Sequence, residues 1–400
     1  MRVPQTWQSA ALTAALGLAA VLVACQTPSE PALPATPLPP PAAQLVESAG
    51  DSAAMGEFSA DRAWGHLTSL AEMAPRVTGT EGAERARDYI VGHLEELGIE
   101  ILPEDTADES GEDGVTPRSL SGIPDDVEPK NILAEIPGAS DDLIVLVAPY
   151  DSRHFDSFAF KGVNDGASGA ALLLELATVL QSESLPYTTW LLFTDAEAPV
   201  GEGPHTTMKT QLFGSRLQAA RFRLDGVLPR IRLIAAFNQV CDADLSISRD
   251  LQSHRLYRED FWAAAERLGH TDAFGNERGF ETPGGAHLSF FLMGARRVVF
   301  IGDLVFGGDE SPGIYADTED DDLEHCSPNS LGVVGSVSAD ALGAIGSRLA
   351  KIDRFSTSPL AKLESEKEDA PDTSTEPLEA LDAIPPAPVP PPETASDETP

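Results

Sequence analysis

The spacing of apolar residues predicts two amphipathic helices near the start of the folded part of the chain. Apolar side chains recur at helical intervals over residues 60–70 and again over residues 86–97. The second stretch ends before Gly98, and glycine is common at the end of a helix because it adopts the left-handed conformation without strain. Each of these helices should therefore bury one face.

Four later segments have the composition of strands, and the last three of them are apolar enough to be buried. They are residues 131–138, 142–151, 188–197 and 230–240. A helical pattern covers residues 166–180, and a last helix begins at Ser327. Strands that alternate with helices predict βαβ crossovers, and continuous apolar strands are typical of sheets buried on both faces. We therefore expect an α/β fold of three layers, with a mixed, mostly parallel sheet between the helices.

The ends of the predicted strands indicate where functional side chains should lie. In sheets of this kind, ligands bind beyond the carboxyl ends of the strands. Three of the predicted strands end near residues 149, 195 and 238. The loops after these residues are therefore the first places to look for chemistry.

The N-terminal residues have the composition of a bacterial lipoprotein signal. An uncharged Ala/Leu-rich stretch over residues 10–24 leads directly to Cys25. Such a stretch is too short to span a membrane as a helix, and the small residues before the cysteine are typical of a lipidation site. We expect residues 1–25 to be the signal peptide with its lipobox, and the mature protein to be lipid-anchored in the cell envelope. Because Gln26 is not the aspartate that commonly retains lipoproteins in the inner membrane, we expect the outer membrane, on the periplasmic side.

Two segments flank the expected domain and lack the apolar residues needed for a core. Residues 26–56 are rich in proline and alanine, and residues 355–400 are rich in proline and acidic residues. These compositions are typical of an extended linker and of a disordered acidic tail. We therefore expect one domain, over residues 57–354.

Charge and cysteine content add two constraints. The formal net charge is −37, which disfavours nucleic acid as a partner because its phosphates would be repelled. Cys241 and Cys326 could pair in an oxidising compartment, but the sequence does not place them within bonding distance. Free thiols are the favoured interpretation.

Several segments together resemble the zinc exopeptidases, the family that includes bacterial aminopeptidases and glutaminyl cyclases. The resemblance covers residues 58–352 and rests on the order and spacing of the segments. They include APYDSRHFD, VNDGASGAALLLELA, LLFTDAEA, NQVCDADLSISRD and YADTEDDDLEHCSPNSL. The resemblance implies the α/β fold of that family, zinc as its cofactor, and peptides or protein N-termini as partners.

The resemblance also implies where zinc ligands should fall. The ligand positions of two-metal members correspond here to Pro149, Asp165, Ala198, Asn238 and Asp317. A catalytic zinc usually has three protein ligands from imidazole, carboxylate or thiolate groups. Only Asp165 and Asp317 keep a carboxylate, so we expect no two-zinc centre and, at the single-zinc site of the cyclases, poor binding.

Glu197 falls on the position of the family's general acid/base and is the candidate catalytic residue. The Asp-Asp-His motif of the cyclases is replaced by Gly285-Ala286-His287. Without a metal beside it, Glu197 is equally well interpreted as a solvated loop residue. Asp165 is equally well interpreted as the cap of the helix that follows it.

Other polar residues offer weaker alternatives. His154, His205 and His287 could form a replacement metal site, but each is better interpreted as a surface or packing residue. The acidic run over residues 319–322 is typical of a solvated turn rather than of a calcium loop.

Three functional hypotheses follow. We favour an envelope lipoprotein whose exopeptidase-like domain has lost most of its metal site and binds peptides or acts as a scaffold. The second hypothesis is an active glutaminyl-peptide cyclotransferase or metallo-aminopeptidase with rearranged ligands. The third is a structural lipoprotein that acts through its acidic tail.

Overall fold

The computed structural model describes most of the expected domain. The described residues are 56–103, 114–199, 210–275, 280–281, 284–308 and 310–357. Residues 1–55 and 358–400 lie outside the described residues. The predicted signal peptide, and the linker and tail apart from a few residues next to the domain, therefore stay predictions.

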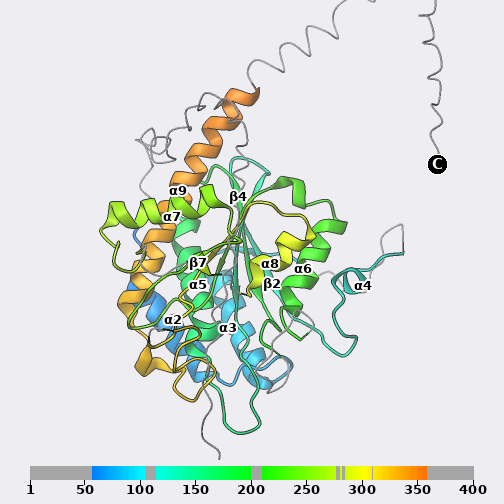
Figure 1. Ribbon diagram of the computed structural model, residues 1–400. Coiled ribbons are helices and arrows are strands. Elements are labelled where there is room, and N and C mark those ends of the chain that lie inside the picture. The colour runs from blue at the N-terminus through cyan, green and yellow to red at the C-terminus, as the bar shows by residue number, and fades with distance from the viewer. Residues whose placement is uncertain are drawn as a thin grey trace, which may run out of the picture. The chain divides into compact units, whose positions relative to one another are not determined.

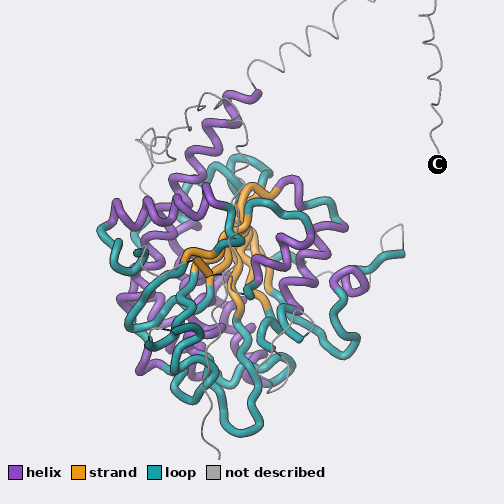
Figure 2. The backbone as a smooth tube through the Cα atoms, in the orientation of Figure 1, coloured by secondary structure: helices purple, strands orange, loops and turns teal. Residues whose placement is uncertain are grey.

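A sheet forms the centre of the domain, as Figure 1 and Figure 2 show. It has six strands. Its strand order is β1-β2-β4-β3-β5-β8. The strands β4, β3, β5 and β8 run parallel, whereas β2 is antiparallel to both β4 and β1. This is the mixed, mostly parallel sheet that the sequence predicts. The strands are β1 (Glu100–Ile101), β2 (Ile132–Ile136), β3 (Leu143–Pro149), β4 (Thr188–Thr194), β5 (Ile231–Phe237) and β8 (Val298–Ile301).

Helices cover both faces of the sheet (Figure 1). Ile144 and Leu146 of β3 pack into one apolar cluster, and Val145 and Val147 pack into a second one. The first cluster includes residues of α2, α3, α5, α7 and α9, and the second includes residues of α6 and α8. This alternation is that of a strand covered on both faces. The helices are α2 (Ala60–Glu72), α3 (Glu81–Glu96), α5 (Ser168–Gln181), α6 (Phe213–Leu224), α7 (Arg255–Leu268), α8 (Ala286–Met293) and α9 (Pro328–Thr357).

Short elements complete the fold and were not predicted. They are the strands β1 and β8, the helix α4 (Pro117–Ser121) and the small pair of β6 (Arg249–Asp250) with β7 (Phe280–Glu281). These elements are too short to show a helical or strand repeat in the sequence. The last helix begins where expected and continues to Thr357, three residues beyond the predicted end of the domain.

Two helical stretches have the length and composition of a membrane span. They are Val163–Gln181 and Pro328–Asp353, and their most apolar windows are 89% and 67% buried inside the domain. Most side chains of α5 are buried, and the helix packs against α2, α9 and the sheet. Both stretches therefore fit the layered core of this domain, in which they have protein neighbours.

Candidate active site

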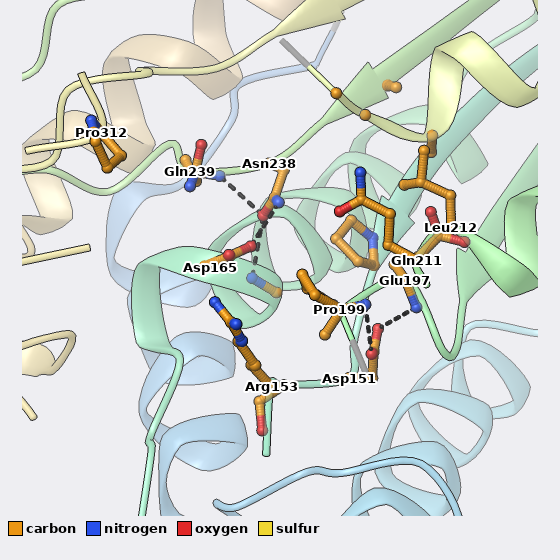
Figure 3. A pocket seen from close by; sticks show the side chains of 18 of the residues that line it. Asp151, Arg153, Asp165, Glu197, Pro199, Gln211, Leu212, Asn238, Gln239 and Pro312 are labelled. Carbon is orange, nitrogen blue, oxygen red and sulfur yellow. Dashed lines mark hydrogen bonds between the residues drawn. The ribbon is translucent and has the colours of Figure 1, made fainter. Parts of the chain in front are cut away.

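A cleft of about 660 Å³ opens at the carboxyl ends of the parallel strands (Figure 3). Its walls include Arg153 from the loop after β3, Glu197 from the loop after β4, and Asn238 from the end of β5. Asp317, far along the chain, lines it as well. The three loops that the strand pattern singled out thus meet at one cleft.

Glu197 is buried at the cleft wall and is not a solvated loop residue, since it is only 7% exposed. Its Oε1 accepts a hydrogen bond from the backbone N–H of Ser215 at 2.5 Å, whereas its buried Oε2 has no hydrogen-bond partner among the described residues. Burial, together with the nearby charge of Asp151, raises the pKa of Glu197 to about 8. With a pKa near 8, the carboxyl group is mostly protonated at neutral pH.

Two buried aspartates hold the loop that carries Glu197, and Figure 3 shows the first of them, Asp151. Asp151 accepts hydrogen bonds from the backbone N–H groups of Glu197 and Ala198, at 3.1 and 3.0 Å. Asp195 accepts one from the hydroxyl of Thr78 at 2.7 Å. Burial raises the pKa of both aspartates, that of Asp151 to about 7. The position of Glu197 is thus fixed by bonds within the chain.

Asn238 binds the carboxylate of Asp165 (Figure 3). Its Nδ2 donates to Oδ1 of Asp165 at 2.8 Å, and its Oδ1 accepts from the backbone N–H groups of Gly166 and Gln239 at 3.0 and 2.9 Å. Those two donors fix which way the amide points. Asp165 is not the cap of the next helix, because α5 begins at Ser168 and receives no cap from a side chain. Burial raises the pKa of Asp165.

Asp317 forms an ion pair with an arginine of the loop after β3. Nη1 of Arg153 lies 2.8 Å from Oδ2 of Asp317, and the two side chains are 6% and 48% exposed. The guanidinium also lies over the ring of Phe155, 4.7 Å from its centroid. The cleft therefore contains a cation that belongs to the chain itself.

The side chains at the expected metal positions do not fit a zinc ion. Pro149 and Ala198 have no donor atom in their side chains, Asn238 offers an N–H to Asp165, and only the carboxylates of Asp165 and Asp317 remain, the second paired with a guanidinium. Within the described ranges, no group of three or more His, Cys, Asp or Glu side chains could hold a metal ion. A catalytic zinc usually needs three such ligands.

The histidines considered as substitute ligands lie in different surroundings. His154 is exposed, with its Nε2 3.0 Å from the carboxylate of Asp156. His287 is fully buried, with its Nε2 3.3 Å from Oδ2 of Asp250. His205 falls outside the described residues. His154 and His287 therefore match the surface and packing interpretations.

The acidic run over residues 319–322 is not simply a solvated turn. Asp321 is 1% exposed and accepts hydrogen bonds from the backbone N–H groups of Asn164 and Asp165, at 2.6 and 3.2 Å. Burial raises the pKa of Asp321 to about 7. The expectation is wrong at this residue because its carboxylate turns inward and satisfies two N–H groups of the loop that carries Asp165.

Cys241 and Cys326 are joined in a disulfide, so the favoured interpretation as free thiols is wrong. Their Cα atoms lie 4.8 Å apart although 85 residues separate them in the chain. The bond links the segment after Asn238 to the segment after Asp321. Only the fold brings the two cysteines together, which is why their spacing did not reveal the pair.

Three residues of the site have no role in the sequence-based prediction: Asp151 and Arg153, which line the cleft, and Asp321, which holds the loop of Asp165. The first two stand in the segment APYDSRHFD, and their position next to a predicted strand end was the available signal. Asp321 gave no such signal, because the neighbouring acidic residues look the same in the sequence.

The comparison with family models decides the classification. Residues 131–342, more than half of the chain, match the model of peptidase family M28. The chain belongs to peptidase family M28. The match contains β2 to β8 and the first half of α9, and so it includes every wall of the cleft described above.

Relatives of this M28 domain include glutaminyl cyclases and zinc proteases. A glutaminyl-peptide cyclotransferase of Drosophila melanogaster is 30% identical over 168 residues, which are 40% of this chain and 43% of the relative. A probable zinc metalloprotease of Pyrenophora tritici-repentis is 32% identical over 153 residues, 35% of this chain and 31% of the relative. The chain thus spans less than half the length of these relatives.

Solved structures with the same fold cover the domain more fully. A glutaminyl cyclase from an Acidobacteriales bacterium superposes with a TM-score of 0.62 at 25% identity, over 74% of this chain and 97% of that protein. A leucine aminopeptidase precursor from Bacteroides thetaiotaomicron gives 0.58 at 21% identity, over 72% and 98%. The second likeness is one of fold alone.

Proposed function

We propose that the cleft of this M28 domain binds peptides or protein N-termini without zinc catalysis. The observation that carries the proposal is the state of the two remaining acidic ligands. Asp165 is bonded by the amide of Asn238, and Asp317 is paired with Arg153. A zinc ion would find only these two carboxylates, one ligand fewer than a catalytic site usually has, and the positive charge of Arg153 lies beside one of them.

The remaining side chains suit a peptide amino terminus. A protonated α-amino group needs hydrogen-bond acceptors and negative charge, and Asp165 and Asp317 supply both at the cleft wall. Oε2 of Glu197 is buried there without a hydrogen-bond partner among the described residues. A ligand group that bonds to it would offset the free-energy cost of leaving this buried oxygen unbonded. The cleft volume of about 660 Å³ is that of a site for a few residues.

The location is part of the same proposal. The apolar residues 10–24 and the cysteine that follows them support a lipid-anchored protein of the cell envelope, facing the periplasm from the outer membrane. Peptides and exposed protein N-termini are available in that compartment. Labelling with a fatty acid, lost on Cys25→Ser, tests the anchor separately from the cleft.

Zinc content and activity test the proposal on the full chain purified in detergent. We expect far less than one zinc per chain after dialysis against micromolar zinc, and no release of ammonia from N-terminal glutaminyl peptides. The matched variant carries Ala198→Glu together with Asp317→His, which restores the ligand types of the one-zinc cyclases. This variant should retain more zinc than the natural chain, because it offers three ligands instead of two.

An active enzyme with rearranged ligands is the alternative, and the burial and raised pKa of Glu197 favour it. Near-stoichiometric zinc in the natural chain would support this alternative if Glu197→Gln also lowered turnover by about 10²–10⁴-fold, the usual contribution of a general acid or base. That result would replace the proposal made above.

A further inference from the structure

A second cavity, of about 460 Å³, lies beside the sheet edge formed by β1 and β2. Its walls come from that edge, from Trp190 of β4 and from one side of α6. It shares no described lining residue with the cleft. Its volume falls within the usual range of small-molecule sites, roughly 300–1,000 Å³.

The described walls of this cavity carry a positive charge in a strongly acidic protein. Arg87 and Arg221 contribute two guanidinium groups, and Asp225 is the single carboxylate among the described lining residues. Arg221 is only 6% exposed. A guanidinium remains charged and has five N–H donors, so it can bind more than one acceptor at a time. The excess of guanidinium groups over carboxylates on the described walls favours an anionic group in the ligand.

A buried amide points to a ligand independently of the charges. Gln218 is 5% exposed and lines the cavity, and its carboxamide makes no hydrogen bond in the described part of the chain. A polar group on a cavity wall, when it has no partner in the chain, can bond only to what enters the cavity. A ligand with a hydrogen-bonding group would supply that partner.

The rest of the wall is apolar and partly aromatic. Trp190 and Phe222 lie with their ring centroids 5.3 Å apart, and Leu102 and Val227 are packed against the same apolar cluster. The indole N–H of Trp190 is already bonded to Glu135 at 2.8 Å, so the ring offers this cavity apolar surface. The ligand body should therefore be apolar and flat.

We propose that this cavity binds a small organic monocarboxylate with an aromatic body. The carboxylate contacts Arg221 and the amide N–H of Gln218, and the body packs against Trp190 and Phe222. The proposal does not depend on the function proposed for the cleft, because the two places have no described wall in common.

Titration of the full chain with 3-phenylpropionate tests the site, with 3-phenylpropan-1-ol as the uncharged probe. We expect saturable binding of the acid in the millimolar range or tighter, as is usual for a ligand of about a dozen non-hydrogen atoms, and at least about tenfold weaker binding of the alcohol. Gln218→Glu should weaken binding of the acid by at least about tenfold, because it sets a second carboxylate against the first. Gln181→Glu makes the same chemical change at an exposed position and should leave the affinity unchanged.

Gln218→Leu keeps the side-chain volume and removes only the amide group. It therefore tests the contact between the amide and the ligand even if Gln218→Glu does not fold. It should weaken binding of the acid about three- to tenfold. Equal affinity for acid and alcohol, no saturable binding of the acid, or acid binding that neither Gln218 variant weakens would overturn the proposal.

Discussion

At the scale of single residues, the site differs from an acidic ligand pair by one atom: Asn238 has a nitrogen where an aspartate would have its second oxygen. An aspartate at position 238 would place a second carboxylate beside Asp165, and two carboxylates attract a cation. Asn238 instead presents an N–H donor 2.8 Å from Oδ1 of Asp165, while its oxygen is used by two backbone N–H groups. The half-buried carboxylate of Asp165 is therefore stabilised by a bond within the chain.

Asn238→Asp should lower the free energy of unfolding at pH 7 by about 1–3 kcal/mol. The variant loses the N–H donor and sets two carboxylates against each other in a half-buried place. The loss should shrink at pH 5, where one proton can be shared by the pair. Urea unfolding at the two pH values measures both effects.

Gln239→Glu is the matched control, because it adds the same charge to the same cleft and leaves the bond between Asn238 and Asp165 in place. It should be clearly less destabilising than Asn238→Asp. Equal losses for the two variants would show that added charge alone, and not the bond to Asp165, is responsible.

The positions of the site residues could be predicted from the sequence, but their partners could not. Asp165, Glu197 and Asp317 were found from the order of the family's segments, and all three line the cleft. Their bonding partners lie far away in the chain: 164 residues separate Arg153 from Asp317, and 73 separate Asn238 from Asp165. Only the fold determines such pairs.

At the scale of elements, the cleft depends on how closely α5 approaches the end of β5. A Cβ atom at Gly169 would lie 2.3 Å from the carbonyl oxygen of Phe237 and 3.3 Å from Cα of Asn238. The contact is with backbone, which cannot rotate away as a side chain can. Glycine at this position therefore lets the helix hold the strand end that carries Asn238.

Gly169→Ala should lower the free energy of unfolding by about 1–3 kcal/mol, because the methyl group forces α5 and β5 apart. Gly65→Ala is the control: Gly65 lies within α2 and has no atom within 4 Å of an added Cβ. That change should raise the free energy of unfolding by about 0.5–1 kcal/mol, the usual difference between alanine and glycine in a helix. Chemical unfolding of both variants measures the contrast, and similar effects from the two would contradict the close approach.

Elements with long apolar patterns were predictable, and those that depend on tertiary contacts were not. The strands β3, β4 and β5 have seven residues each, and the apolar runs that predict them cover each of them. β8 has four residues and owes its place to pairing with β5. α4 has five residues and is held by its capping box, a feature too local to stand out in a hydrophobic pattern.

At the scale of the whole molecule, buried carboxyl groups link stability to pH. The pKa values of Asp151, Glu197 and Asp321 are raised by burial to about 7, 8 and 7. Between the ordinary carboxyl pKa and these values, the folded state holds protons that the unfolded state has released. The stability is therefore greatest on the acid side of this window and falls as the pH rises through 7 and 8. His66 limits the gain at the acid end, because burial lowers its pKa to about 4 and the unfolded state takes up its proton below about pH 6.5.

We expect the free energy of unfolding to fall by a few kcal/mol between pH 6.5 and pH 8.5, since each tenfold change in proton affinity between the unfolded and folded states corresponds to about 1.4 kcal/mol. Glu197→Gln removes one of the three carboxyl groups and keeps an acceptor for the N–H of Ser215, so it should reduce that fall by about 1–2 kcal/mol. Glu95→Gln removes a negative charge from an exposed position of α3 and should leave the slope as it is, which separates burial from the effect of net charge. Urea unfolding across this pH range measures all three slopes. If both variants reduced the fall of the unfolding free energy with pH by the same amount, the cause of that fall would be the general negative charge of the chain. The proposal that Glu197 is protonated because it is buried would then be wrong.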